Sequence, residues 1–327
     1  MRISVHRGFL AGLLILLALA LSGGALAALA LGISPRLQLL STRTVQAASF
    51  VHLGLVGWIG GMLTIVLAAR LVRRPGLAAL ALPLALGALW QATWIVPYYT
   101  TNTVAHRTPL TVATINVQDG RADLDGLTAQ LQTADVIVIV EHTDAARERL
   151  ADRGLTESHP HAVHVGNGVG GTSIYSRLPL EDLGAGPTVF GSPVVRLDHP
   201  DGPLTLIAAH PVNPMGGAEL WAEDAAALRA VILAHADGPV VVAGDLNAID
   251  RHATMRPLLT TDGFRSTADL TGAGFPRTWP TREHGPFPVL GIDYVLVNAP
   301  LTAVSHRTFT VTGTDHVGII AQVALRA

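Results

Sequence analysis

The chain has 327 residues and a formal net charge of −2, but its charged side chains are divided unevenly along the sequence. No Asp or Glu occurs before Asp119, and residues 107–327 carry 15 of the 22 arginines and all 24 acidic residues, a formal charge of −9. A region this acidic lacks the basic stripe that binds a nucleic-acid backbone, so general nucleic-acid binding is disfavoured. The chain has no cysteine, which excludes disulfide scaffolds, Cys-ligated zinc, iron–sulfur clusters and thiol nucleophiles.

Three uncharged apolar runs lie within residues 1–106, and we predict that this part is a transmembrane region. The runs cover residues 9–33, 50–69 and 77–99. A helix needs about 20 residues to cross the hydrocarbon core, so each run is long enough to span it. Aromatic side chains gather at the end of the third run, where amphipathic rings favour the headgroup layer: Trp90, Trp94, Tyr98 and Tyr99.

Arginines beside the three runs predict the orientation. An N-terminus in the cytoplasm places five of them on the cytoplasmic side and three outside, which agrees with the positive-inside rule. An alternative for the first run is a cleaved signal peptide, because Ala25-Leu26-Ala27 resembles a cleavage site. Both alternatives predict a protein of the cell membrane with residues 107–327 on the extracytoplasmic side. The three-span alternative makes it multi-pass.

From Leu110 onward the sequence predicts an α/β domain, which we place at residues 107–327. The β-branched runs TVATINV (111–117) and VIVIVE (136–141) flank a helix-like stretch, which indicates strand, helix and strand. Further short strands follow, among them LTLIAAH, VVVAGDLN and DYVLVN, and the segment 218–234 predicts a helix. Many strands with a few helices are typical of a layered α/β domain.

Polar residues stand where these predicted strands end. Each alone has an ordinary structural explanation: a turn former for Asn116, a helix cap for Glu141, a surface histidine for His210 and a satisfied core carboxylate for Asp293. Polar groups at several strand ends converge on one edge of a sheet, as a functional site requires. We therefore predict one site from the whole series: Asn116, Glu141, His210, Asp245, Asn247, Asp293, Asp315 and His316.

These motifs resemble those of the endonuclease/exonuclease/phosphatase (DNase I-like) superfamily of metal-dependent phosphoesterases. The resemblance covers residues 111–325 and implies a four-layer α/β sandwich, two packed β-sheets flanked by helices. The layout with N-terminal membrane helices is similar to that of bacterial teicoplanin-resistance proteins. The motifs that carry it are INV at Asn116, VIVIVE at Glu141, GGTSIYSRLPL at Ser176 and Arg177, AAH at His210, GDLNA at Asp245 and Asn247, GIDYVLV at Asp293, and GTDH at Asp315 and His316.

The resemblance implies a role for each predicted site residue. Glu141, helped by Asn116, would hold Mg²⁺ or Mn²⁺, hard cations that prefer oxygen ligands. Asp245 would orient or deprotonate the attacking water, and Asn247 would hold a phosphoryl oxygen. His210 would stabilise developing charge with Asp293 fixing its tautomer, and His316, paired with Asp315, would be the second acid/base group. Whether Asp245 or His316 is the general base stays open.

Two further patterns imitate functional motifs. The histidines of HPHAVH (159–164) have no strong metal-ligand spacing. The glycine-rich GNGVGG (166–171) is not followed by a helix pattern, so a hairpin turn before TSIYS is the favoured interpretation.

The sequence therefore predicts a membrane-anchored, metal-dependent phosphoesterase. Its partners would be the lipid bilayer and a phosphorylated or pyrophosphorylated lipid substrate, with a cell-wall lipid carrier fitting the resistance-protein resemblance and nucleic acid disfavoured. Two alternatives stay open: an exported nuclease or sphingomyelinase-like phosphodiesterase, and a binding module that kept the fold without catalysis. No feature of the sequence indicates an oligomeric state.

Overall fold

The structure is a computed structural model that describes residues 2–102, 104–285 and 288–327. The chain forms two compact units, Met1–Val96 and Pro97–Ala327. The domain boundary that the sequence suggests after residue 106 stays a prediction. Each unit is described separately below.

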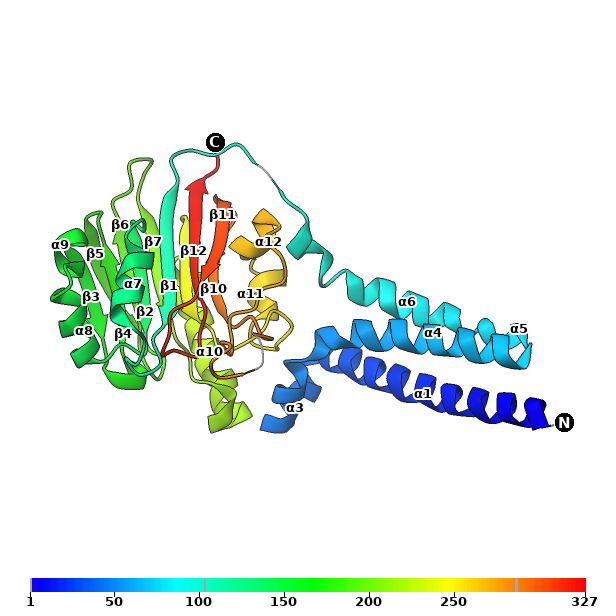
Figure 1. The fold of residues 1–327 in the computed structure, drawn as a ribbon. Coiled ribbons are helices and arrows are strands. Elements are labelled where there is room, and N and C mark those ends of the chain that lie inside the picture. The colour runs from blue at the N-terminus through cyan, green and yellow to red at the C-terminus, as the bar shows by residue number, and fades with distance from the viewer. Residues whose placement is uncertain (1, 103, 286–287) are drawn as a thin grey trace. The chain divides into compact units, whose positions relative to one another are not determined.

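The first unit is entirely helical. Three stretches are long and apolar enough to cross a membrane, His6–Ile33, Val51–Val72 and Pro75–Ala92, which confirms the three apolar helices expected from the sequence. Figure 1 shows the principal helices of this unit. The helices of this unit are α1 (Arg2–Ile33), α2 (Pro35–Gln38), α3 (Thr42–Ala48), η1 (Val51–Leu53), α4 (Gly54–Val72), α5 (Pro75–Ala78) and α6 (Ala81–Ala92), and the short helix η2 (Val96–Tyr99) begins at its last residue and continues into the second unit.

Small residues allow α1 and α4 to pack closely. A Cβ added at Gly57 would lie 2.9 Å from the backbone oxygen of Leu21 and 3.0 Å from the Cβ of Ala25, and one added at Gly61 would lie 2.5 Å from the Oγ of Ser22. This close backbone approach is typical of helix pairs in a bilayer, where association depends on packing because lipid tails are as apolar as leucine.

The third predicted apolar run ends differently from the sequence prediction. Its last helix, α6, stops at Ala92. Tyr98 is buried, and its ring lies edge-on 5.5 Å from that of Phe275, a residue of the second unit. Tyr98 therefore packs within the second unit, and the aromatic belt at the headgroup layer stays a prediction.

The second unit contains two six-stranded sheets, each with parallel and antiparallel neighbours (Figure 1). The first has the order β11-β12-β1-β2-β4-β3, with bounds Leu301–Phe309, Gly318–Leu325, Leu110–Asn116, Val136–Val140, Thr172–Ser176 and His161–Val165. The second has the order β5-β6-β7-β8-β10-β9, with bounds Leu180–Gly186, Ser192–Leu197, Leu204–Ala209, Val240–Asp245, Asp293–Val297 and Arg265–Ser266.

Period-two alternation of apolar side chains explains the layering. In β2, Val136 and Val138 belong to one buried cluster, while Ile137 and Ile139 belong to another. The first cluster also includes residues of the second sheet such as Val241, so it is the core between the two sheets. The strand is buried on both faces, which is why it consists only of Val and Ile.

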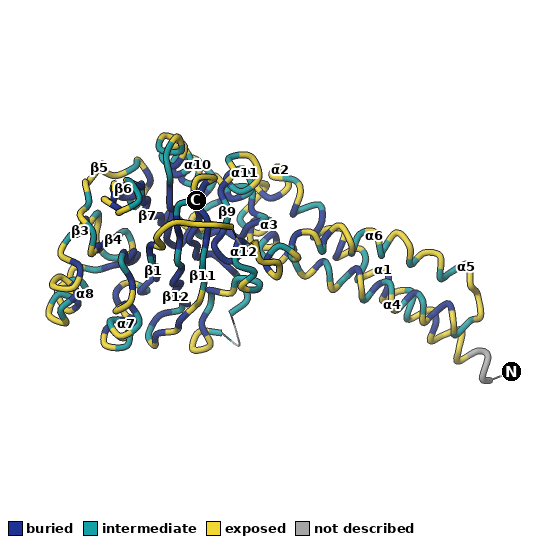
Figure 2. The backbone as a smooth tube through the Cα atoms, turned by 90° about the horizontal axis from the view of Figure 1, so that it is seen from above, coloured by how far each residue is buried: buried dark blue, intermediate teal, exposed yellow. Residues whose placement is uncertain are grey.

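Helices cover the outer faces of both sheets. The second buried cluster joins Ile137 and Ile139 to Leu127 and Leu150 on two helices, and the fully buried Trp221 lies on the helix packed on the second sheet. Figure 2 shows the buried backbone running through the strands. This arrangement confirms the predicted sandwich. The helices are α7 (Leu124–Leu131), α8 (Asp144–Ala151), α9 (Leu155–Ser158), η3 (Gly168–Gly170), η4 (Pro214–Gly216), α10 (Ala218–Ala234), α11 (Arg256–Thr260) and α12 (Thr267–Thr271).

Candidate active site

The predicted site residues lie at the ends of central strands from both sheets. Asn116 ends β1 and Glu141 follows β2, and these two strands are parallel neighbours in the first sheet. In the second sheet, Asp245 ends β8 and Asp293 opens β10, and the antiparallel register of β8 and β10 pairs these two residues directly. His316 precedes β12 of the first sheet. The fold therefore brings five polar side chains, from distant parts of the chain, to one shared edge.

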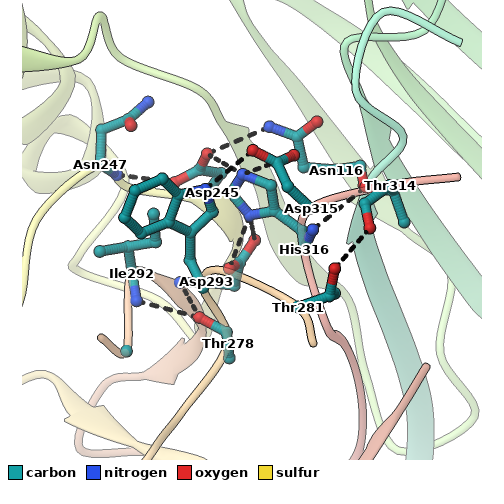
Figure 3. Close-up of polar contacts among 12 residues, drawn as sticks. Asn116, Asp245, Asn247, Thr278, Thr281, Ile292, Asp293, Thr314, Asp315 and His316 are labelled. Carbon is teal, nitrogen blue, oxygen red and sulfur yellow. Dashed lines mark hydrogen bonds and ion pairs between the residues drawn. The ribbon is translucent and has the colours of Figure 1, made fainter. Parts of the chain in front are cut away.

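Asn116 links the two sheets. Its side-chain amide donates to a carboxylate oxygen of Glu141 at 2.9 Å. The same amide donates to Oδ2 of Asp245 at 3.1 Å (Figure 3). Its Oδ1 accepts from the backbone N–H of Gln118 at 2.8 Å. The second oxygen of Glu141 accepts from the backbone N–H of Asp119 at 2.9 Å. The amide thus holds two carboxylates that would otherwise repel each other.

His316 lies between two carboxylates. Its Nδ1 is 3.0 and 3.2 Å from the two oxygens of Asp293, and its Nε2 is 3.6 Å from Oδ2 of Asp245. Burial works to lower the pKa of His316, but the charges of Asp293 and Asp245 outweigh burial and raise that pKa to about 10. Burial raises the pKa of Asp245 to about 6, against the effect of His316. The imidazole is therefore a cation at neutral pH.

This geometry corrects one sequence prediction. Asp293 was expected to fix the tautomer of His210, with Asp315 as the partner of His316. Asp293 instead holds Nδ1 of His316, while Asp315 lies 3.8 Å from Nε2 and accepts a 2.9 Å hydrogen bond from Nε1 of Trp279. The sequence did not show which histidine Asp293 would contact, because Asp293 and His316 lie at strands of different sheets and meet only in the fold.

His210 follows β7 and lies beside Glu141. Its Nε2 is 3.9 Å from Oε1 of Glu141, and its ring lies 5.1 Å from that of Phe190. Burial lowers the pKa of His210 more than the carboxylate of Asp245 raises it. A neutral imidazole next to Glu141 is therefore expected at neutral pH, in contrast to His316.

Two site residues adopt left-handed backbone conformations. Glu141 has φ 56° and Asn247 has φ 49°, values that few residues other than glycine adopt. Asn247 donates from its side chain to the backbone oxygen of Pro211 at 3.0 Å, and its own N–H binds Asp245. Gly244 precedes Asp245, and a Cβ at this position would lie 2.0 Å from the backbone oxygen of Ala209, so a glycine is required here for β8 to pair with β7.

Several supporting residues had not been predicted from the sequence. The hydroxyl of Thr314 donates to the backbone oxygen of Asn116 at 2.8 Å and accepts from the N–H of His316 at 3.2 Å. The hydroxyl of Thr278 accepts from the N–H of Asp293 at 3.1 Å (Figure 3). Thr314 is the first residue of the TDH motif, so the motif itself was a signal for this residue. Thr278 lies outside every motif, and only the tertiary structure brings it to the site.

Glu141 does not cap the following helix, since Thr143 accepts the capping hydrogen bond of α8. Arg177 lies elsewhere, donating to the backbone oxygen of Gln132 at 2.5 Å.

The HPHAVH histidines have other partners. His159 contacts the backbone oxygen of Ala134 at 3.0 Å, and Nδ1 of His164 lies 2.9 Å from Oγ of Ser173. The glycine-rich segment 166–171 connects the antiparallel strands β3 and β4, as the hairpin prediction required.

The site is rich in metal-ligating atoms. Asp245, Asp293 and His316 each offer one ligand atom, and these atoms lie within 4.8 Å of one another. Glu141 and Asn116 supply additional oxygen atoms beside this triad, joined to it by the hydrogen bond from Asn116 to Asp245. Among the described residues, the ion-pair partners of Glu141, Asp245 and Asp293 are histidines.

Comparison with known proteins agrees with this geometry. The family model described as "Endonuclease/Exonuclease/phosphatase family" matches residues 113–316, which include every predicted site residue. The chain belongs to this family, whose members are metal-dependent hydrolases of phosphoesters. The comparison with curated proteins found no match.

Solved structures share the fold. An endonuclease/exonuclease/phosphatase from Beutenbergia cavernae is 21% identical with a TM-score of 0.54, covering 68% of this chain and 72% of that chain. D. rerio TDP2, solved in complex with a single-strand DNA product, is 20% identical with a TM-score of 0.53, covering 66% of this chain and 99% of that chain. The second unit thus has the fold of phosphoesterases in this family.

Proposed function

We propose that the protein is a membrane-anchored, divalent-metal-dependent phosphoesterase that hydrolyses a phosphorylated or pyrophosphorylated membrane lipid. The observation that carries the proposal is the continuous polar network from Glu141 through Asn116 and Asp245 to His316 and Asp293. Its members are buried or nearly so, although carboxylates are rarely buried without a partner or a function.

The donor set fits a hard divalent cation. Asp245 and Asp293 lie beside the imidazolium of His316, and Asn116 links Glu141 to Asp245. Three carboxylates against one imidazolium give the cluster an excess of negative charge that a cation would offset. Glu141 and Asn116 would hold Mg²⁺ or Mn²⁺, because these ions prefer oxygen ligands. The ion would offset the negative charge of the phosphoryl oxygens.

The side chains account for the proton transfers of hydrolysis. Asp245, with its pKa raised to about 6, would accept a proton from the attacking water as the oxygen–phosphorus bond forms. His316 is held by Asp293 with Nε2 toward the site, so it would stabilise the phosphoryl oxygens and donate a proton to the leaving oxygen as its bond to phosphorus breaks. Asn247 would bind a phosphoryl oxygen.

Charge and anchoring support a lipid substrate. Residues 107–327 carry a formal charge of −9, which disfavours a long polyanion, while a single headgroup has few phosphates. Three apolar helices indicate membrane association, which would keep the catalytic unit near headgroups. A cell-wall lipid carrier pyrophosphate on the extracytoplasmic side, in a pathway linked to glycopeptide resistance, fits both features.

The orientation can be tested with one engineered thiol, because the chain has no cysteine. Thr261 is exposed in the second unit, so Thr261→Cys provides an accessible label. A membrane-impermeant maleimide should label this variant in intact cells. Labelling only after lysis would contradict an extracytoplasmic catalytic unit.

A nuclease is the second candidate, since a structural neighbour, D. rerio TDP2, was solved with a single-strand DNA product. The substrate class is tested by assaying the purified full-length protein, with Mg²⁺, against a lipid pyrophosphate, sphingomyelin, an inositol phosphate and single-stranded DNA. The proposal predicts the highest kcat/KM for the lipid pyrophosphate. A higher value for DNA would favour the nuclease, and no turnover of any of them would favour a non-catalytic module.

A further inference from the structure

The first unit contains a cavity that is lined by three arginines. This cavity of about 1070 Å³ lies among α1, the end of α4 and the start of α5, and the three arginines are Arg7, Arg73 and Arg74. This volume is slightly above the range of about 300 to 1,000 Å³ that is typical of ligand sites. None of its lining residues belongs to the catalytic unit.

The end of α4 explains why two arginines reach one cavity. Arg73 has φ 56° and ends the helix in the left-handed conformation, and the N–H of Arg74 closes the helix by donating to the backbone oxygen of Ala69 at 2.9 Å. Pro75 then starts α5. Arg7 comes from α1, so the three guanidinium groups are contributed by two different parts of the chain.

The first unit has no acidic side chain to neutralise these arginines, because no Asp or Glu precedes Asp119. Three guanidinium groups around one cavity repel one another unless an anion enters. Guanidinium groups bind phosphate oxygens with paired N–H donors. The charge therefore favours a phosphate-bearing ligand.

The remaining walls indicate what the phosphate is attached to. Glycines and alkyl side chains line the cavity besides the arginines, including Gly8, Gly12, Ile15, Leu71 and Leu77. A Cβ added at Gly8 or Gly12 would meet nothing within 4 Å, so the space in front of α1 is open. Arginines at a helix end above an apolar wall match a phospholipid, with its headgroup at the arginines and its acyl chains along the helices.

We propose that this cavity, the arginine cavity, binds the headgroup of an anionic phospholipid. This binding requires only that the first unit lies in a bilayer, and it does not depend on the catalytic proposal. The bound lipid would act as a counter-ion for the three arginines and join α1 to the α4–α5 turn.

Native mass spectrometry of the full-length protein in detergent, titrated with phosphatidylglycerol or phosphatidylcholine, tests the proposal without any activity readout. We expect retention of phosphatidylglycerol, and at least about tenfold weaker binding when Arg73→Gln and Arg74→Gln are combined. Arg70→Gln is the matched control, because Arg70 is an exposed arginine of the same helix end that does not line the cavity.

Two further variants keep the test decisive if the double variant inserts poorly. Arg73→Lys with Arg74→Lys keeps the positive charge but loses the paired donors, and Gly12→Leu fills the cavity while leaving every arginine in place. Both should weaken phosphatidylglycerol binding. Equal binding by Gly12→Leu, equal loss in Arg70→Gln, or displacement of the lipid by inorganic phosphate would overturn the proposal.

Discussion

Replacing Asp293 by Asn should reduce catalysis far more than the same change at Asp315. Both carboxylates lie near His316, but Asp293 is 3.0 Å from its Nδ1 and is buried, whereas Asp315 is 3.8 Å from its Nε2 and partly exposed. Burial lowers the pKa of His316, but the carboxylates outweigh burial and raise this pKa from 6.5 to about 10, a net shift equivalent to about 5 kcal/mol. Loss of a close opposite charge lowers such a pKa by about one to three units.

We therefore expect Asp293→Asn to lower kcat by about 10²- to 10⁴-fold, the range for losing a positioned acid/base group. The limb of the pH–rate profile that belongs to His316 should move to lower pH. The assay is kcat and kcat/KM against pH for both variants, with thermal unfolding of each to detect misfolding. A larger loss in Asp315→Asn, or an unmoved profile in a folded Asp293→Asn variant, would refute the pairing of Asp293 with His316.

Three further predictions follow from the described contacts. Asp245→Ala and His316→Ala should each lower kcat at least about 100-fold, and the double variant should be barely worse, since the two groups act as a unit; additive losses would contradict this. His161→Ala and His164→Ala should leave kcat nearly unchanged. Burial lowers the pKa of His142 from 6.5 to about 3, so only the unfolded chain gains this proton as pH falls below about 6.5. As the pH falls from about 7 to about 5, the free energy of unfolding of wild type should therefore decrease by about 2 kcal/mol more than that of His142→Asn. Denaturant titrations at each pH measure this difference.

The strands and most of the site residues could be predicted from the sequence because each is marked by a short run of neighbouring residues. Runs such as VIVIV can be buried on both faces only in a sheet interior, and GDLNA combines a glycine without room for a Cβ with a left-handed Asn247. The predicted sandwich was confirmed, since alternating residues of β2 belong to two separate hydrophobic cores, one on each face of the sheet.

The pairings across strands could not be predicted in this way. The register between β8 and β10 pairs Asp293 with Asp245, and Asp293 contacts His316 only because the two sheets pack together. Thr278 reaches Asp293 from a loop with no motif. Tyr98 follows an apolar run as interfacial aromatics do, yet it packs on Phe275. The arginine cavity likewise depends on helix ends that are distant in sequence and meet only in the folded unit.

Metal dependence at Glu141 tests the central claim most directly. The measurement is phosphate release from a lipid pyrophosphate by the full-length protein in lipid nanodiscs, after EDTA and after return of Mg²⁺ or Mn²⁺, for wild type and Glu141→Gln. Wild type should lose all activity in EDTA and regain it with either ion, while Glu141→Gln, which removes a charge but keeps the shape, should stay much slower at equal metal. Full wild-type activity in EDTA, or a Glu141→Gln variant with unchanged rate and metal dependence, would contradict the account.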